Sequence, residues 1–151
     1  MIVTFCGHSS FCGNIEYENK IISFLEESVG AEKVEMYLGG YGDFDDFAYK
    51  CCIKYKEKHP DASLVFVTPY MTESYQENHL KFIGQKYDFI IYPEIEEKPL
   101  RFAISYRNRW MIDRADLVIC GIEHSWGGAY KTYAYAKSKK KAIVNIMQEK
   151  L

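Results

Sequence analysis

Short apolar runs alternate with longer amphipathic stretches along the whole chain. The apolar runs are rich in β-branched and aromatic residues, and most stop at glycine, proline or polar turn formers, which is typical of β-strands. This pattern predicts strands at Ile2–Cys6, Val34–Leu38, Leu64–Val67, Phe89–Tyr92, Leu117–Ile122 and Ala142–Ile146.

The stretches between these runs carry apolar residues at helical spacing. The first helix begins at Ile15, after Asn14 as N-cap, and its apolar face is formed by Ile21, Ile22, Leu25 and Val29. The next two helices end near Lys58 and Gly84, and the last two span Leu100–Arg114 and Ala129–Ser138. Expected core residues of the second and fourth helices are Phe47, Cys51, Tyr55, Phe102, Ala103, Met111 and Ile112. Alternating strands and helices predict an α/β fold: an open parallel sheet of about six strands, with helices on both faces, in one domain over residues 1–151.

Glycines follow several of the predicted strands directly. Gly7 and His8 follow the first strand, Gly39, Gly40 and Gly42 the second, and Gly127 and Gly128 lie beyond the fifth. Parallel strands end at one edge of the sheet, where ligands of such folds bind, and glycine lets the backbone approach an anion closely. The sequence therefore predicts one nucleotide-binding cleft at this edge, although a tight strand-to-helix turn also explains the first glycine cluster.

Carboxylates and hydroxyls accompany these glycines. Asp43 and Asp45 follow the first cluster, where they either accept from a ribose hydroxyl or base amine, or cap the next helix. Ser125 and Thr132 flank the second cluster and offer hydroxyl groups.

Two arginines lie on the helix before the fifth strand. Arg107 and Arg109 are two positions apart, so at most one of them faces the cleft. That one is a candidate for a bidentate contact to phosphate; otherwise both lie on the solvated face. His8 is either a ligand contact or an ordinary loop histidine.

Composition narrows the possible partners. A net charge of −2 and a pI near 6.1 lack the basic excess of a general nucleic-acid binder, so we expect nucleic acid to be an unlikely partner. The five cysteines and four histidines show no metal-site spacing, and no apolar run is long enough to span a membrane. We expect a soluble cytoplasmic protein without metal or cofactor. The tyrosine-rich helix Ala129–Ser138 is a possible homo-oligomer contact or a buried face of the monomer.

Four segments, taken in order, resemble the SLOG superfamily, which unites the Smf/DprA proteins with the LOG phosphoribohydrolases. The chain most resembles the small bacterial stand-alone members of unassigned function, which show a T-F-x-G-H start and an R-N-x-x-M-[IV]-D-x-[AS]-D stretch before a strand. The matching segments are Thr4–His8, Gly39–Asp45, Arg107–Asp113 and Gly127–Gly128. The resemblance implies a Rossmann-like, nucleotide-binding fold. It also implies ligand contacts at Gly7, His8, Gly39, Gly40, Gly42, Arg107, Gly127 and Gly128.

The chain departs from the LOG enzymes at the second glycine cluster. Their pattern P-G-G-x-G-T-x-x-E ends in a catalytic glutamate, and Ser125–Ala134 holds no carboxylate at that place. The leading hypothesis is therefore binding of a nucleotide-derived small molecule without turnover. The alternative is an N-glycosidic hydrolase or transferase, with Glu123, Asp43 or Asp45 as the catalytic carboxylate and Arg107 or Arg109 on the phosphate. A third hypothesis is single-stranded DNA binding as in DprA.

Overall fold

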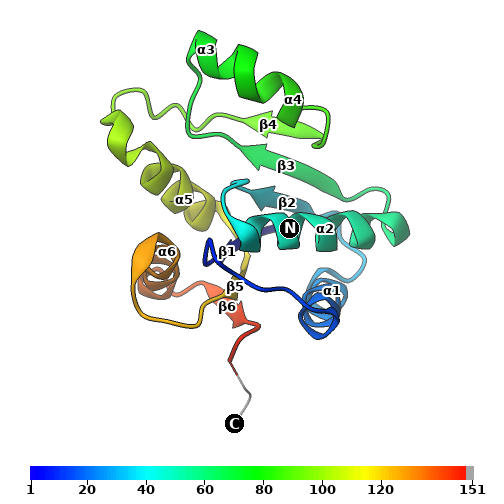
Figure 1. Cartoon of the computed structure of the whole chain (residues 1–151). Helices are drawn as coiled ribbons and strands as arrows, with labels where there is room; N and C mark the ends of the chain where they lie inside the picture. The colour runs from blue at the N-terminus through cyan, green and yellow to red at the C-terminus, as the bar shows by residue number, and fades with distance from the viewer. Residues whose placement is uncertain (149–151) are drawn as a thin grey trace.

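The computed structural model describes residues 1–148 and contains one six-stranded, all-parallel sheet (Figure 1). Its strand order is β4-β3-β2-β1-β5-β6. The strands are β1 (Ile2–Gly7), β2 (Glu35–Leu38), β3 (Ser63–Val67), β4 (Phe89–Ile91), β5 (Leu117–Gly121) and β6 (Ala142–Asn145). The predicted Rossmann-like α/β fold is confirmed, with strand bounds that differ from the predicted ones by one residue.

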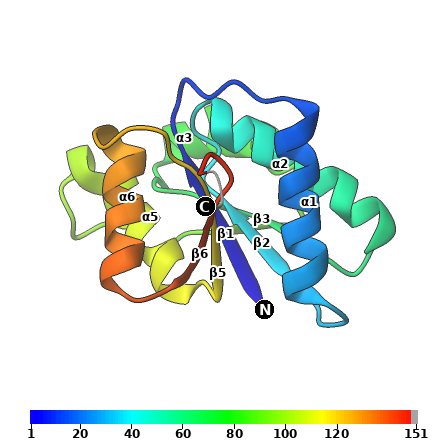
Figure 2. The same cartoon turned by 90° about the horizontal axis from the view of Figure 1, so that it is seen from below.

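Helices cover both faces of the sheet (Figure 2). One face carries α1 (Ile15–Val29) and α2 (Asp43–Lys58), and the other carries α5 (Ala103–Arg114) and α6 (Gly127–Ser138). Successive residues of a strand point to opposite faces, and β1 shows this clearly. Val3 and Phe5 belong to the core beneath α1 and α2, whereas Cys6 packs with residues of α5 and α6.

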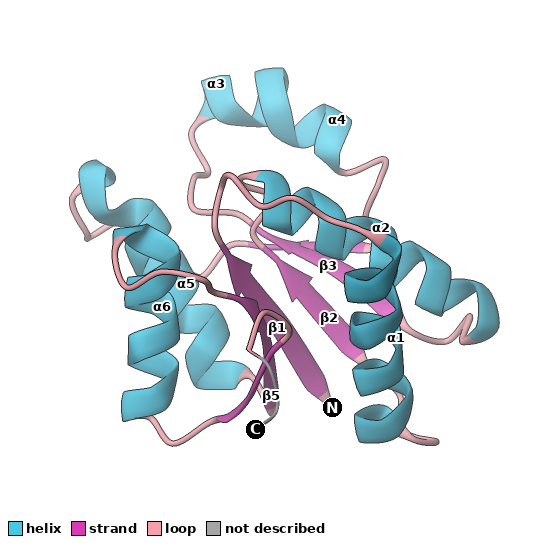
Figure 3. Ribbon diagram, turned by 60° about the horizontal axis from the view of Figure 1, so that its bottom comes forward, coloured by secondary structure: helices cyan, strands magenta, loops and turns pink. Residues whose placement is uncertain are grey.

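Two helical segments differ from the prediction. The segment before β4 consists of α3 (Glu73–Tyr75), a π-helical turn (Gln76–Leu80) and α4 (Lys81–Ile83), and it lies near β4 at one edge of the sheet (Figures 1 and 3). A 3-10 turn, Leu100–Phe102, precedes α5. Phe102 was expected in the core but is 45% exposed, because the regular helix begins only after it.

On α2 the core position is Phe44 rather than Phe47, which is half-buried. The Phe44 ring packs against the backbone of Gly7 and Gly121, the paired last residues of β1 and β5. A Cβ on Gly7 would lie 2.1 Å from that ring, and one on Gly121 would lie 2.6 Å from it. These two glycines make room for Phe44.

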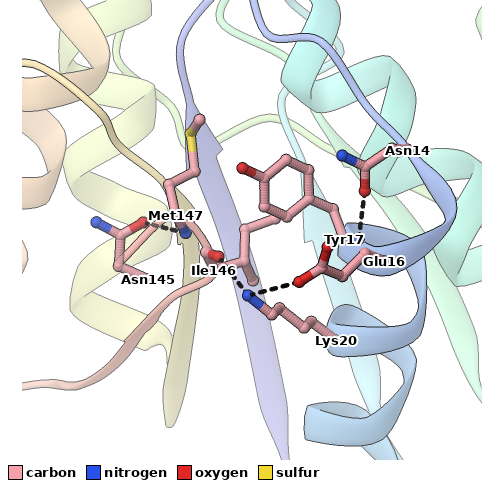
Figure 4. Close-up of polar contacts among 7 residues, drawn as sticks. All are labelled: Asn14, Glu16, Tyr17, Lys20, Asn145, Ile146 and Met147. Carbon is pink, nitrogen blue, oxygen red and sulfur yellow. Dashed lines mark hydrogen bonds and ion pairs between the residues drawn. The ribbon is translucent and has the colours of Figure 1, made fainter. Parts of the chain in front are cut away.

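The start of α1 is linked to the segment after β6 (Figure 4). Asn14 accepts a hydrogen bond from the backbone N–H of Tyr17 at 2.8 Å, which confirms it as the N-cap. Lys20 donates to the carbonyl oxygen of Ile146 at 3.4 Å and lies 3.8 Å from Glu16.

All five cysteines are free thiols, and only Cys12 is exposed. Within residues 1–148, no helix is both long and apolar enough to cross a membrane.

Candidate functional site

A pocket of about 350 Å³ lies where β1 and β5 end. The strand order reverses between these two strands, and open α/β sheets bind ligands at this switch point. The loop after β1, the turn after β2, helix α5 and the start of α6 all line the pocket. Of the predicted site residues, it brings together Gly7, His8, Asp45, Arg107, Gly127, Gly128 and Thr132.

Arg107 is the only arginine in the pocket lining, and its side chain is just 2% exposed. Its Nη1 donates to the carbonyl oxygens of Gly39 at 3.0 Å and Val67 at 2.8 Å, where β2 and β3 end. Its Nε donates to the side chain of Asn108 at 2.8 Å. Burial lowers the pKa of Arg107, and the nearby Asp45 opposes that shift. The guanidinium is thus a fixed cation at the edge of the sheet.

Asp45 is the only one of the three candidate carboxylates that lines the pocket. Burial raises the pKa of its carboxyl group to about 6, although the N–H of Tyr41 and the charge of Arg107 both lower it. The Tyr41 N–H donates to the Asp45 carboxylate at 2.9 Å, which holds the turn after β2. Near neutral pH this group therefore changes charge inside the pocket.

Three stacked rings, His8, His124 and Trp126, also line the pocket. His8 lies on His124 with ring centres 3.6 Å apart, and His124 lies on Trp126 at 3.7 Å. The Nε2 atom of His8 accepts from the backbone N–H of Glu123 at 3.0 Å and of His124 at 3.3 Å. Burial and the neighbouring His124 lower the pKa of His8, so the neutral ring is favoured. The stack fixes the loop that presents Trp126, which is 68% exposed.

The N-terminus of α6 also borders the pocket, through Gly127, Gly128 and Ala129. Among residues 1–148, no side chain caps this end of the helix. A Cβ built on either glycine would meet no atom within 4 Å, so the space in front of them is open. Thr132 lines the pocket, but its hydroxyl donates to the Gly128 carbonyl oxygen at 3.1 Å.

The first glycine cluster, Gly39–Gly42, is explained by packing. A Cβ on Gly39 would lie 2.8 Å from the Arg107 guanidinium, and one on Gly40 would lie 2.7 Å from Phe66. Gly42 has a φ of 92°, and its Cβ would lie 2.7 Å from the Ser9 backbone. None of these three glycines lines the pocket, so the structure favours the tight-turn interpretation for them.

Four other candidates lie outside the pocket lining: Asp43, Arg109, Glu123 and Ser125. Asp43 is exposed, and its backbone N–H donates to the carbonyl oxygen of Ser9. Arg109 is exposed and lies over the ring of Tyr135, 5.3 Å from its centre. Of the two arginines on α5, the structure therefore places Arg107 in the pocket lining and Arg109 outside it.

The sequence did not reveal the role of Asn108, and at the pair His124 and Trp126 it suggested stacking on a base only for His124. Asn108 follows Arg107 directly and orients its guanidinium, and a polar neighbour of a buried arginine is the signal that points to it. Trp126 precedes the second glycine cluster, and the structure shows that it stacks on His124 and is exposed.

No protein-family model matches the chain, and no curated protein sequence matches it significantly. Two solved structures of DNA processing protein A (DprA) match in fold. The Streptococcus pneumoniae protein has a TM-score of 0.62 at 16% identity, over 93% of this chain and 48% of its own. The Helicobacter pylori protein has a TM-score of 0.61 at 16% identity, over 95% of this chain and 63% of its own. The chain has the fold of the Smf/DprA proteins and spans less than two thirds of either neighbour.

The expectation that nucleic acid is an unlikely partner is contradicted. The H. pylori DprA structure, which matches the fold of nearly the whole chain, is described by its single-stranded DNA binding mode. A negative net charge does not exclude nucleic-acid binding, because binding responds to the local field around a groove and not to the sum over the chain. Helix α1, which has more glutamates than lysines, lowers the total charge from the face of the sheet opposite to α5 and α6.

Proposed function

We propose that this chain binds single-stranded DNA, with one nucleotide held in the pocket at the ends of β1 and β5. The observation that carries the proposal is that anion-binding groups and an exposed indole line the same pocket. A nucleotide needs both, one for its phosphate and one for the face of its base.

The anion-binding side consists of Arg107 and the start of α6. The guanidinium is already fixed by the carbonyl oxygens of Gly39 and Val67, so little conformational entropy is lost when it meets a phosphate. The helix contributes backbone N–H groups and the positive end of its dipole. Open space in front of Gly127 and Gly128 allows a phosphate to approach.

The base-binding side is Trp126. One face of its indole lies on His124, which in turn lies on His8, so the ring is held before any ligand arrives. Stacking on an aromatic ring suits every base and gives little sequence preference, as single-stranded DNA binding requires. The single-stranded DNA binding mode of the H. pylori DprA, which shares this fold, supports DNA as the source of the nucleotide.

The test is fluorescence anisotropy with a labelled thymidylate oligomer, against wild type and Trp126→Ala. Loss of one stacked base weakens binding by about 5- to 150-fold. The matched control is Phe82→Ala on α4, a ring 60% exposed and outside the pocket lining, which leaves the affinity unchanged. Equal affinities for wild type and Trp126→Ala would rule out this pocket as the DNA site.

A free nucleotide-derived ligand, bound without turnover, is a second candidate. A pocket of about 350 Å³ falls in the size range of small-ligand sites, which favours it. Nucleoside monophosphates, NAD and ADP-ribose separate the candidates: a thermal upshift with one of them, without DNA binding, supports the small ligand. Release of free base would instead support the hydrolase hypothesis, with Asp45 as the carboxylate that lines the pocket.

A further inference from the structure

A second hollow, of about 520 Å³, continues from the pocket between α5 and α6. The two share four lining residues: Ile104, Asn108, Gly128 and Thr132. We call the second one the α5–α6 groove. A ligand that leaves the pocket past Gly128 therefore enters the groove directly.

Among residues 1–148, the groove is lined by three cations and by no carboxylate. Arg101, Arg109 and Lys131 are all exposed, and none forms an ion pair with a residue in the described part of the chain. Asp113 lies on the same helix as Arg109 but outside the groove lining, where its carboxylate accepts from the Tyr135 hydroxyl at 2.7 Å. The groove therefore concentrates positive charge in a protein whose net charge is negative.

An exposed aromatic ring lies beside these cations. Phe102 lines the groove and is 45% exposed, and the Arg101 guanidinium lies 4.8 Å from the centre of its ring. Cations next to an open aromatic face are the combination that binds the backbone and bases of a single strand. Phe102 was expected in the core, but its exposed ring lines the groove and is accessible to a ligand there.

We propose that the α5–α6 groove is a second nucleotide subsite, which binds the phosphate and base adjoining the nucleotide in the pocket. Arg109 and Lys131 contact the linking phosphate, and Phe102 stacks on the second base. The inference rests on the proposed function and makes it more specific. The natural ligand is a strand of at least two linked nucleotides, and a free mononucleotide fills only the first subsite.

The experiment compares thymidine 5′-monophosphate, the 5′-phosphorylated thymidylate dinucleotide and an oligomer of about ten nucleotides. On wild type, we expect the dinucleotide to bind about tenfold or more tightly than the mononucleotide, because it adds charged hydrogen bonds to a phosphate. The double variant Arg109→Ala/Lys131→Ala removes the part of this difference that comes from the linking phosphate and keeps the mononucleotide affinity. We also measure the slope of log K against log salt for oligomer binding. In the double variant, the magnitude of this slope is smaller than in wild type by roughly 0.7 for each phosphate that the variant no longer neutralises.

The matched control is Arg114→Ala/Lys137→Ala. These residues lie on α5 and α6, are exposed and lie over aromatic rings, but they do not line the groove. If the double variant and this control bind every ligand as wild type does, while Trp126→Ala still weakens binding, the second subsite is refuted and the pocket stands. If wild type binds none of the three ligands, both proposals fail.

Discussion

The guanidinium of Arg107 occupies the space that a side chain on Gly39 would need. A Cβ at Gly39 would lie 2.8 Å from Cζ, and the carbonyl oxygen of the same glycine accepts from Nη1 at 3.0 Å. The glycine after β2 therefore serves the arginine on α5, 68 residues further along the chain. Because Gly39 does not have a positive φ, the contact alone excludes a larger residue.

Gly39→Ala tests this contact. The guanidinium can move away only by giving up its bonds to Gly39 and Val67, so we expect a loss of about 1–3 kcal/mol in the free energy of unfolding. Urea denaturation measures it. Gly128→Ala is the control, because its Cβ meets no atom within 4 Å. An unchanged unfolding midpoint for Gly39→Ala would show that Arg107 is not held as described.

This relationship also shows what the sequence could and could not predict. Alternating apolar runs predicted the sheet because strand and helix periods are local properties. Glycines at the strand ends predicted the edge where the pocket lies. However, Gly39 contacts a residue far away in the sequence, so its role could not be read from its neighbours.

For the same reason, the sequence alone could not show whether Arg107 or Arg109 faces the pocket. Helical geometry separates their directions, but only the packing of α5 shows which direction is inward. Likewise, the net charge of −2 did not reveal that Arg101, Arg109 and Lys131 gather in one groove, because they come from different elements of the chain. The sequence pattern predicted the edge where the pocket lies, and the tertiary contacts show which residues line that pocket.

Asp45→Asn should stabilise the protein near neutral pH. The folded pKa of about 6 lies above the ordinary value of 3.8, so folding favours the protonated carboxyl group. The resulting stability is complete below 3.8 and is lost as pH rises through about 6. Asparagine does not titrate and keeps the oxygen that accepts from Tyr41. We expect a gain of about 1–3 kcal/mol at neutral pH that disappears near the ordinary pKa, measured by urea denaturation.

The same carboxylate should make DNA binding depend on pH. As Asp45 ionises, its negative charge opposes a phosphate in the pocket, so wild-type affinity should fall as pH rises through about 6. Asp45→Asn should remove that fall. Asp43→Asn, at an exposed position outside the pocket, should keep it. Anisotropy titrations across this pH range give the comparison, and parallel profiles for wild type and Asp45→Asn would contradict it.

The hydrogen bonds by which His8 stabilises the loop after β5 should depend on pH. Only a neutral imidazole has a ring nitrogen that accepts the N–H groups of Glu123 and His124. Because the folded pKa of His8 is lowered, this stability is present above its ordinary value of 6.5 and is lost as pH falls through the folded pKa. The backbone amides of Glu123 and His124 should therefore lose protection from hydrogen exchange as pH falls through the folded pKa of His8. In His8→Phe the protection should be low at every pH, and a titration that survives in this variant would assign it to another group.

Gly128→Asp should separate stability from binding at the start of α6. The position has room for a side chain, and a carboxylate in the first turn of a helix interacts favourably with its dipole by about 0.3–1 kcal/mol. The fold should therefore be as stable as wild type or more so. The same negative charge lies where a phosphate must approach, so affinity for the thymidylate oligomer should fall about tenfold or more. Thermal unfolding and anisotropy measure the two effects, with the uncharged Gly128→Ala as control. If Gly128→Asp binds as tightly as Gly128→Ala, the phosphate does not lie at the N-terminus of α6, and Arg107 alone must hold it.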